Sequence, residues 1–186
     1  MTDVSDIIDL IADIIERRGA ESYLGEAVTM AEHMLQTASL AQAQGAPDAV
    51  VAAALLHDIG HYTSEFGEYS DEDTIDRKHD AAGAKVLDGH FPPLVTECVR
   101  LHVAAKRYLC ATESTYCDSL SLASKHSLAL QGGPMDEAEI ARFRSQPFHE
   151  EAVAVRRWDD GGKVAGVQTM AFDDFRPLLH RVLDRG

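Results

Sequence analysis

The segment VVAAALLHDIGH, residues 50–61, decides the fold. Its first seven residues carry small and branched apolar side chains on every side of a helix, so we expect a helix that is buried all round. Pro47 stands where such a helix would begin, and the pattern predicts that it runs to about His57. The polar pair His57 and Asp58 follows, and an unpaired carboxylate in an apolar setting costs several kcal/mol. Both side chains therefore need partners.

Outward from this segment, apolar residues recur at helical spacing in most of the chain. A first helix is predicted before Gly19, and further helices at about 29–44, 78–88, 94–105, 118–130, 136–146 and 172–183. Residues 60–76 lack periodicity and are predicted to form a long loop. Since no strand pair, repeat or linker is evident, we expect an all-α fold in which residues 1–186 form a single helical domain.

The composition excludes several classes of function. Asp and Glu outnumber Lys and Arg by 31 to 17, a net charge of −14, which repels nucleic acid and anionic membrane surfaces. No apolar run reaches the length of a membrane span and no signal-like start is present, so a cytoplasmic protein is expected. Cys98, Cys110 and Cys117 fit neither a disulfide framework nor a CxxC metal site, and we expect them to be plain core residues.

The chemistry points to the histidines. His33, His79 and His102 join His57 at the ends or middles of different apolar segments. Each of them alone fits a hydrogen-bonded core histidine, and Asp58 alone fits a helix cap. Four such histidines, one directly followed by Asp58, are better explained by convergence on one metal centre, because imidazole and carboxylate are ligands of first-row transition metals.

These residues also carry a family resemblance. The order His33, His57-Asp58 and Asp159 resembles the H...HD...D ligand set of the HD-domain superfamily, which is all-helical and metal-dependent. Within it the chain is most similar to the mixed-valent di-iron oxygenases, and there to the branch that cleaves 1-hydroxyphosphonates. The supporting segments are YLGE (23–26), ALLHDIGHY (54–62), HVAAKRYL (102–109), LSLAS (120–124), QGGPMDE (131–137) and the RxWD-like Arg156, Trp158 and Asp159.

The resemblance implies two iron ions, one Fe2+ and one Fe3+. One would be held by His33, His57, Asp58 and Asp159, and the other by the bridging Asp58, His79, His102 and, at rest, Tyr23. The donor types alone would also suit manganese or zinc. A bridging carboxylate makes physical sense, because an anion between two cations offsets their repulsion.

The same resemblance assigns a substrate site, with a plainer alternative for each residue. Lys106, one helical turn after His102, and His61, one turn after His57, would bind a phosphonate; otherwise they are a surface lysine and a structural histidine. Ser124 and Ser127 would line the same site, although by spacing alone they are ordinary helix residues. Glu26 would face a substrate ammonium, or simply stabilise a helix start. Tyr23 would be displaced when substrate binds.

The implied reaction is an O2-dependent cleavage of the carbon–phosphorus bond of a small 1-hydroxy-2-ammonioethylphosphonate. A primary amine would give glycine and phosphate, whereas a trimethylammonium group would give glycine betaine and favour aromatic contacts. Candidates for such contacts are Tyr62, Phe66, Tyr69, Tyr108 and Tyr116. The alternative enzyme is a dinuclear HD-domain phosphohydrolase acting on a phosphate ester or nucleotide. A non-catalytic binding module is disfavoured, because every ligand position is filled.

Overall fold

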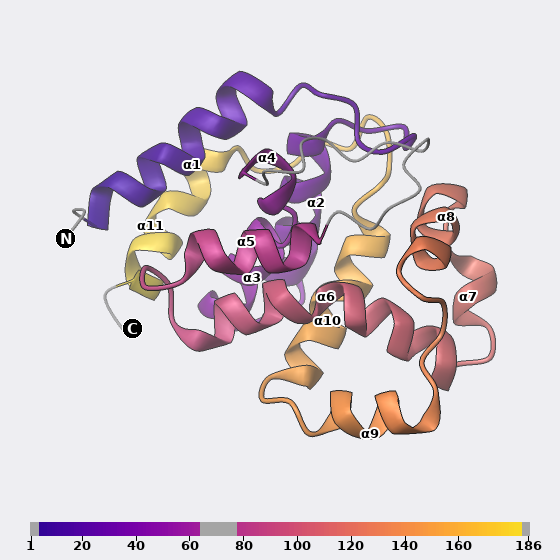
Figure 1. Cartoon of the computed structure of the whole chain (residues 1–186). Helices are drawn as coiled ribbons and strands as arrows, with labels where there is room; N and C mark the ends of the chain where they lie inside the picture. The colour runs from indigo at the N-terminus through magenta and orange to yellow at the C-terminus, as the bar shows by residue number, and fades with distance from the viewer. Residues whose placement is uncertain (1–3, 64–77, 184–186) are drawn as a thin grey trace.

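The computed structural model describes residues 4–63 and 78–183, and in them an all-helical arrangement (Figure 1). The helices are α1 (Val4–Arg18), α2 (Met30–Ala43), α3 (Asp48–Leu56), α4 (Gly60–Thr63), α5 (His79–Leu87), α6 (Pro93–Thr112), α7 (Tyr116–Ser119), α8 (Leu122–Leu130), α9 (Glu137–Arg144), α10 (His149–Gly161) and α11 (Phe172–Leu183). Within these residues the only strand-like pairing is an isolated bridge between Ser22 and Thr29. The all-α prediction is confirmed.

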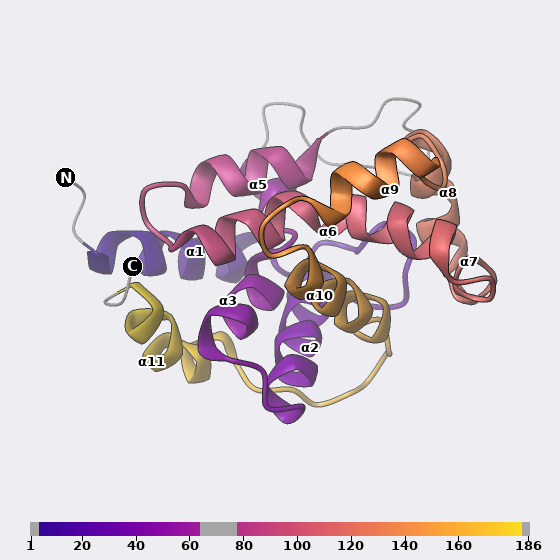
Figure 2. The same ribbon diagram turned by 90° about the horizontal axis from the view of Figure 1, so that it is seen from below.

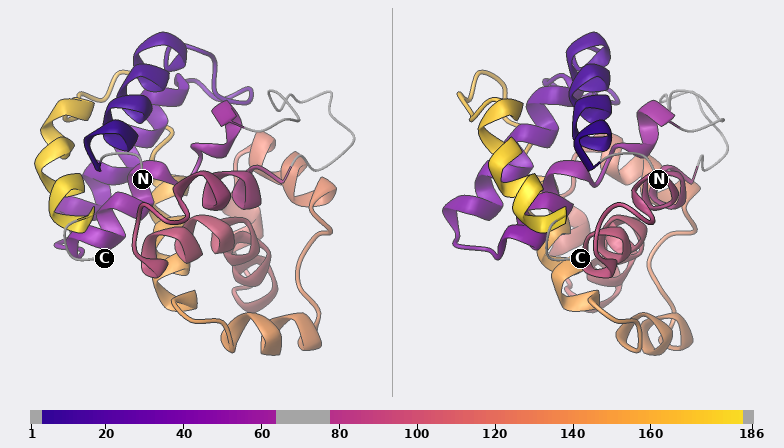
Figure 3. Two further views of the ribbon diagram at one scale, coloured as in Figure 1. Left: turned by 60° about the vertical axis from the view of Figure 1, so that its left-hand side comes forward. Right: turned by 90° about the vertical axis from the view of Figure 1, so that its left-hand side faces the viewer.

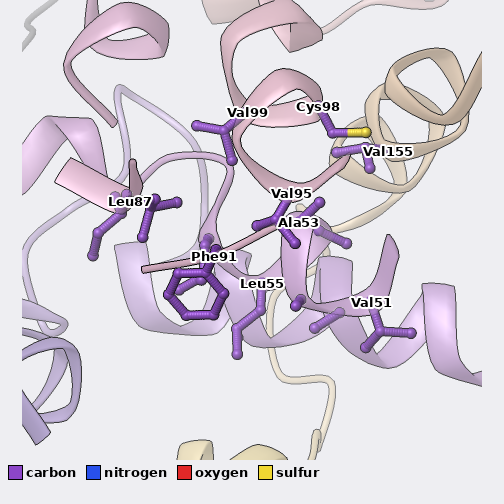
Figure 4. Packing of buried hydrophobic residues seen from close by; sticks show 14 of the residues in the cluster. Val51, Ala53, Leu55, Leu87, Phe91, Val95, Cys98, Val99 and Val155 are labelled. Atoms are coloured by element: carbon purple, nitrogen blue, oxygen red, sulfur yellow. The ribbon is translucent and has the colours of Figure 1, made fainter. Parts of the chain in front are cut away.

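Helix α3 lies at the centre of the packing, as the sequence predicts. Its residues from Val50 to Leu56 are all buried, and it contacts α2, α6, α10 and α11. Figure 4 shows Leu55 and Val51 among side chains from the surrounding helices, including Val95 of α6 and Val155 of α10. Because α3 is enclosed on all sides, its C-terminal end lies in the interior of the bundle.

Helices α1 and α11 pack together over one side of this core, at the edge seen in Figures 2 and 3. Ile8 and Ile11 of α1 and Phe175 and Leu179 of α11 are fully or almost fully buried in the cluster that contains α3. Their burial explains the strong apolar periodicity of both segments. Among the described residues, no helix has both the length and the apolar character needed to cross a bilayer.

Several predicted boundaries were wrong. The predicted loop begins with the short helix α4, and its residues 64–76 lie outside the described residues. The predicted helix at 118–130 is broken at Leu120, whose backbone is extended, so that Ser121 caps α8 by accepting a hydrogen bond from the Ser124 amide. Helix α6 continues seven residues past the predicted end at 105.

Helix α10 was not predicted at all. Its buried face consists of Ala152, Val155, Arg156 and Asp159, so its apolar stripe is replaced by charged groups at one end. The pattern of hydrophobic residues therefore fails where this helix enters the interior, and that is where the candidate site lies.

The prediction for the cysteines was also partly wrong. Cys98 is a buried core thiol as expected, but Cys110 and Cys117 form a disulfide. The disulfide joins the last turn of α6 to α7 across a separation of seven residues. An odd cysteine count and the absence of a CxxC motif do not reveal a pair whose members are brought together by a helix end and a tight turn.

Candidate metal centre

His33 and His57 face each other in the interior. His33 comes from α2 and directs Nδ1 to the carbonyl of Gly162 at 2.9 Å, while His57, at the end of α3, directs Nδ1 to the carbonyl of Ala54 at 2.8 Å. Their Nε2 atoms lie 3.1 Å apart. A carbonyl only accepts, so each Nδ1 carries a proton, and the neutral form of each ring presents an Nε2 lone pair. Two facing lone pairs repel unless a proton or a metal ion lies between them.

A second pair repeats this arrangement. The Nε2 atoms of His79, from α5, and His102, from α6, also lie 3.1 Å apart. His102 directs its Nδ1 to the carbonyl of Val99 at 2.7 Å, which leaves its Nε2 as a lone pair. Both rings are almost completely buried. The chain therefore builds two histidine pairs, each suited to a cation.

Asp58 lies between the two pairs. Its Oδ2 is 3.3 Å from His57 Nε2 and 3.5 Å from His33 Nε2, and its Oδ1 is 3.4 Å from the Nε2 atoms of His79 and His102. Among the described residues, Oδ2 is buried without a hydrogen-bond partner. A buried carboxylate oxygen of this kind is costly unless it binds a cation. One oxygen for each pair makes Asp58 suited to bridging two ions.

Gly60 allows the second pair to approach Asp58. A Cβ atom at Gly60 would lie 1.9 Å from the carbonyl oxygen of His79 and 2.7 Å from the amide nitrogen of Gly83. Only glycine permits so close a crossing of α4 and α5. The glycine two residues after Asp58 thus brings α5, and with it His79, against the end of α3.

Asp159 completes the first group of donors from α10. Its Oδ1 is 3.4 Å from His33 Nε2 and 3.3 Å from Lys163 Nζ, and it is buried without a hydrogen-bond partner in the described residues. Its Oδ2 accepts a hydrogen bond of 2.6 Å from Arg156 Nη1. One oxygen of Asp159 is therefore held by the protein while the other faces His33.

The ionisation states agree with metal binding. Burial alone would raise the pKa of Asp58, but His57 and the nearby His102 and His33 hold this pKa well below its ordinary value. Burial would likewise raise the pKa of Asp159, but Arg156 and Lys163 keep it well below the ordinary value. Burial lowers the pKa of His33 and, much further, that of His79. Burial would also lower the pKa of His57, but Asp58 and Asp159 raise it above its ordinary value, so a metal ion would take the place of a proton on this ring. Anionic carboxylates and neutral imidazoles are the forms that bind metals.

The donor groups fit a resident metal. His33, His57 and Asp58 place potential ligand atoms within 4.8 Å of one another, and Asp58, His61 and His79 form a second such group. The side chains converge from α2, α3, α5 and α6, so the site exists only in the folded chain. We conclude that this is a metal-binding site. His61, predicted to bind substrate, also stacks on His79 with ring centroids 4.1 Å apart.

A cavity opens beside the second pair, and it contains the predicted substrate residues. Its volume is about 30 Å³. Lys106 is buried and donates a hydrogen bond of 2.6 Å to Ser127 Oγ. Glu26 accepts a hydrogen bond from Ser121. The lining includes Tyr23, Glu26, Asp58, His61, His79, His102, Lys106, Ser124, Ser127, Gln131, Arg156, Asp159 and Lys163.

Tyr23 covers the first histidine pair. Its ring is buried and stacks on His33, with centroids 4.0 Å apart and planes inclined by 12°. Burial, followed by the negative charges of Asp58 and Asp159, raises the pKa of Tyr23 well above its ordinary value. Tyr23 is thus a neutral phenol beside the donor groups in this structure, and its ligation of an ion remains a prediction.

Sequence reasoning gave no site role to Lys163, Arg156 or Gln131, which also line this cavity. Lys163 Nζ donates to Ser124 Oγ at 2.9 Å and lies 3.9 Å from Glu26 Oε1. Because α10 was not predicted, the helical spacing of four residues between Asp159 and Lys163 went unused, although it was the available signal.

The predicted aromatic contacts have mixed outcomes. Tyr108 stacks on Phe143 and Tyr116 hydrogen-bonds to Asp160, and neither lines the cavity. The guanidinium carbon of Arg18 lies 5.2 Å from the ring centroid of Tyr62, which packs beside Tyr23 without lining the cavity. Phe66 and Tyr69 lie outside the described residues.

Comparison with known proteins agrees with a metal-dependent HD-domain protein. The model of the HD domain family matches residues 30–160. The chain is 54% identical over 179 residues to the [1-hydroxy-2-(trimethylamino)ethyl]phosphonate dioxygenase (glycine-betaine-forming) of Leisingera caerulea, covering 96% of this chain and 91% of the relative. It is 44% identical over 165 residues to the hydroxymethylphosphonate dioxygenase of Gimesia maris, covering 88% and 82%. The chain belongs to the HD domain family, in the group that includes these phosphonate dioxygenases.

Proposed function

We propose that this protein is a di-iron oxygenase that uses O2 to cleave the carbon–phosphorus bond of a small 1-hydroxyphosphonate. The observation that carries the proposal is the position of Asp58, which directs one oxygen to each of two histidine pairs. Next to these pairs lies a cavity whose lining includes lysine and arginine side chains. The relatives named above are dioxygenases of such phosphonates, which supports both the oxidative reaction and the substrate class.

In the reaction, R–CH(OH)–PO₃H₂ and O2 give R–COOH and H₃PO₄, so one O2 is consumed for each phosphate released. Two iron ions, one Fe2+ and one Fe3+, would supply the redox chemistry by which O2 oxidises the substrate. His33, His57, Asp58 and Asp159 would hold one ion, and Asp58, His79 and His102 the other, with Tyr23 as a displaceable ligand.

The chain supplies the charge that binds the phosphonate. Lys106 and Lys163 reach the same side of the cavity, with their ammonium groups on Ser127 and Ser124. Arg156 adds a further positive charge to the lining, whereas burial lowers the pKa of His61, which therefore lines the cavity as a neutral, hydrogen-bonding ring. Because these groups are already buried and oriented, they bind an anion without reorganisation. Phosphate, the product anion, would be held by the same groups.

The amine end of the substrate is assigned to Glu26. Its carboxylate lines the cavity, so its negative charge can pair with a substrate ammonium. Lys163 lies 3.9 Å from this carboxylate. We propose [1-hydroxy-2-(trimethylamino)ethyl]phosphonate as the first substrate to test, because the relative that is 54% identical is named for it. The primary amine analogue is the second.

We also infer that residues 1–186 form one domain. Helices α1 and α11 lie outside the residues matched by the family model, yet Ile8 and Phe175 are buried in the same core as α3. This shared burial supports a single folding unit.

The test is phosphate release by iron-loaded protein, with and without O2, from the trimethylammonium substrate, its primary amine analogue and hydroxymethylphosphonate. We expect release only with O2, in a 1:1 ratio to O2 consumed, and glycine betaine or glycine as the second product. Oxygen-independent release from a phosphate ester, with none of the three phosphonates cleaved, would instead identify a phosphohydrolase.

A further inference from the structure

Arg156 links the ligand Asp159 to a second acidic residue. Its Nη1 donates to Asp159 Oδ2 at 2.6 Å, while its Nε, 3.2 Å from Asp160 Oδ2, and its Nη2 both donate to the carboxylate of Asp160. Arg156 is only 4% exposed. A planar guanidinium held on both edges cannot rotate, so it fixes which oxygen of Asp159 is left for a metal.

Tyr116 hydrogen-bonds to both members of the Arg156–Asp160 ion pair. Its hydroxyl accepts a hydrogen bond of 3.1 Å from Arg156 Nε and donates one to Asp160 Oδ2. The phenol therefore uses both its donor and its acceptor on the two residues that orient Asp159. Without the hydroxyl, the Asp160 carboxylate and the Nε of Arg156 each lose a partner that is itself buried.

Tyr116 is fixed in turn by the Cys110–Cys117 disulfide. Tyr116 begins α7, a helix of only four residues, which is too short to be stable by itself. The disulfide ties the residue next to Tyr116 to α6, with the two Cα atoms 5.0 Å apart. Tyr116 also packs with Leu109, Leu120 and Leu128 in a small apolar cluster. The cross-link therefore restricts the one residue of α7 that reaches the interior.

We propose that Tyr116, held by the Cys110–Cys117 disulfide, is a positioning residue for the metal ligand Asp159 and acts through Arg156 and Asp160. The proposal rests on Asp159 being a metal ligand and is independent of the substrate. It assigns a role to a half-buried cross-link that has no direct contact with the predicted ligands.

The first test compares Tyr116→Phe with Tyr108→Phe. Tyr108 is a matched control, because its hydroxyl also accepts a hydrogen bond from an arginine, Arg144, but lies away from the ligands. Co2+ is titrated into metal-free protein, and both its affinity and its visible absorption spectrum are measured. We expect Tyr116→Phe to weaken Co2+ binding about three- to tenfold and to change the spectrum, since partners of metal ligands affect affinity about 10–100-fold and Tyr116 is one contact further away. Tyr108→Phe should do neither.

The second test opens the disulfide. A trialkylphosphine and water convert it to two thiols and a phosphine oxide, and the reagent is then removed before titration with Co2+. Reduced wild type and the Cys110→Ser/Cys117→Ser variant should both bind Co2+ more weakly, and adding Tyr116→Phe to that variant should cost less than it does in wild type. Phosphine treatment of the double serine variant controls for the reagent and should change nothing.

Thermal unfolding of the metal-free variants separates positioning from stability. If Tyr116→Phe or reduction lowers the melting temperature but leaves Co2+ affinity and spectrum as in Tyr108→Phe, the positioning role is overturned and the cross-link serves only stability. If wild type binds no Co2+, there is no metal site, and the positioning role of Tyr116, which rests on that site, is overturned with it.

Discussion

His33 Nε2 and His57 Nε2 are 3.1 Å apart, and the Nδ1 atom of each ring is directed to a backbone carbonyl. This relationship fixes the tautomer of both rings before any ion arrives. The same holds for His102 in the second pair. The members of the two pairs are 24 and 23 residues apart in sequence, and the fold brings the Nε2 atoms of each pair together. A metal ion at each pair would bind these facing nitrogen atoms.

Because Asp58 directs one oxygen to each histidine pair, removing Asp58 and removing a single histidine should change the metal content by different amounts. His79→Ala should remove one of two metal equivalents, because the pair His33 and His57 remains intact. Asp58→Asn should remove both or nearly both, because each pair loses its anionic oxygen. Metal content after gel filtration, measured by elemental analysis, checks this. Equal stoichiometry in the two variants would contradict a bridging role, and His126→Ala, a change at an exposed histidine of α8, is the control.

The buried amine of Lys106 predicts a pH dependence. Burial, helped by the nearby Arg156, lowers the pKa of Lys106 from 10.5 to about 7. The charged form binds the phosphonate, so it is present below pH 7 and is lost as pH rises through this value in the free enzyme. We expect kcat/KM to fall about tenfold per pH unit on the alkaline side.

Lys106→Arg should remove that limb of the profile, because guanidinium stays charged throughout. Lys125→Arg is the matched control, since Lys125 is exposed on α8 and donates only to the carbonyl of Asp118. An unchanged limb in Lys106→Arg would assign the ionisation to another group.

Glu26→Gln should discriminate between substrates. Removing the carboxylate charge is expected to raise KM about tenfold for an ammonium-bearing phosphonate, which corresponds to about 1.4 kcal/mol, and to leave KM for hydroxymethylphosphonate nearly unchanged. Steady-state kinetics with both substrates measures the ratio. Equal effects on the two substrates would remove Glu26 from ammonium binding.

Gly60→Ala should damage both folding and the second metal group. The added Cβ meets backbone atoms at 1.9 and 2.7 Å, so α5 must move away from α4. We expect a loss of about 1–3 kcal/mol in the free energy of unfolding and loss of one metal equivalent. Gly89→Ala is the control: it has a φ of +76° but open space around it, so it should cost stability without loss of metal.

Much of the fold could be predicted because the hydrophobic pattern and the burial agree. Helix α3 is apolar on every side and is enclosed on every side, and α2 begins at Met30, capped by Thr29 in a capping box completed by Glu32. The pattern failed where burial is polar. In α10 the buried Arg156 and Asp159 took the place of apolar residues, so periodicity could not show the element that carries the predicted ligand Asp159.

The donor residues could be predicted for a related reason. A single histidine in an apolar helix fits a hydrogen-bonded core residue, but four of them, one directly followed by Asp58, indicated a shared centre, and their convergence is now seen in the two Nε2 pairs. Pairwise geometry could not be read from the chain: neither the approach of Lys163 to Glu26 nor the link from Cys117 to Cys110 has a local pattern. The first depends on how distant segments pack, and the second on the tight turn between α6 and α7.

The convergence of donors from α2, α3, α5, α6 and α10 gives the bundle a second source of cooperativity. An ion bound by these side chains binds only the native state, so its binding free energy is added to the unfolding free energy of all these helices at once. Metal loss would then loosen the centre of the molecule rather than a peripheral loop. Bound metal thus stabilises the native state, and the lifetime of the folded chain depends on the supply of its ion.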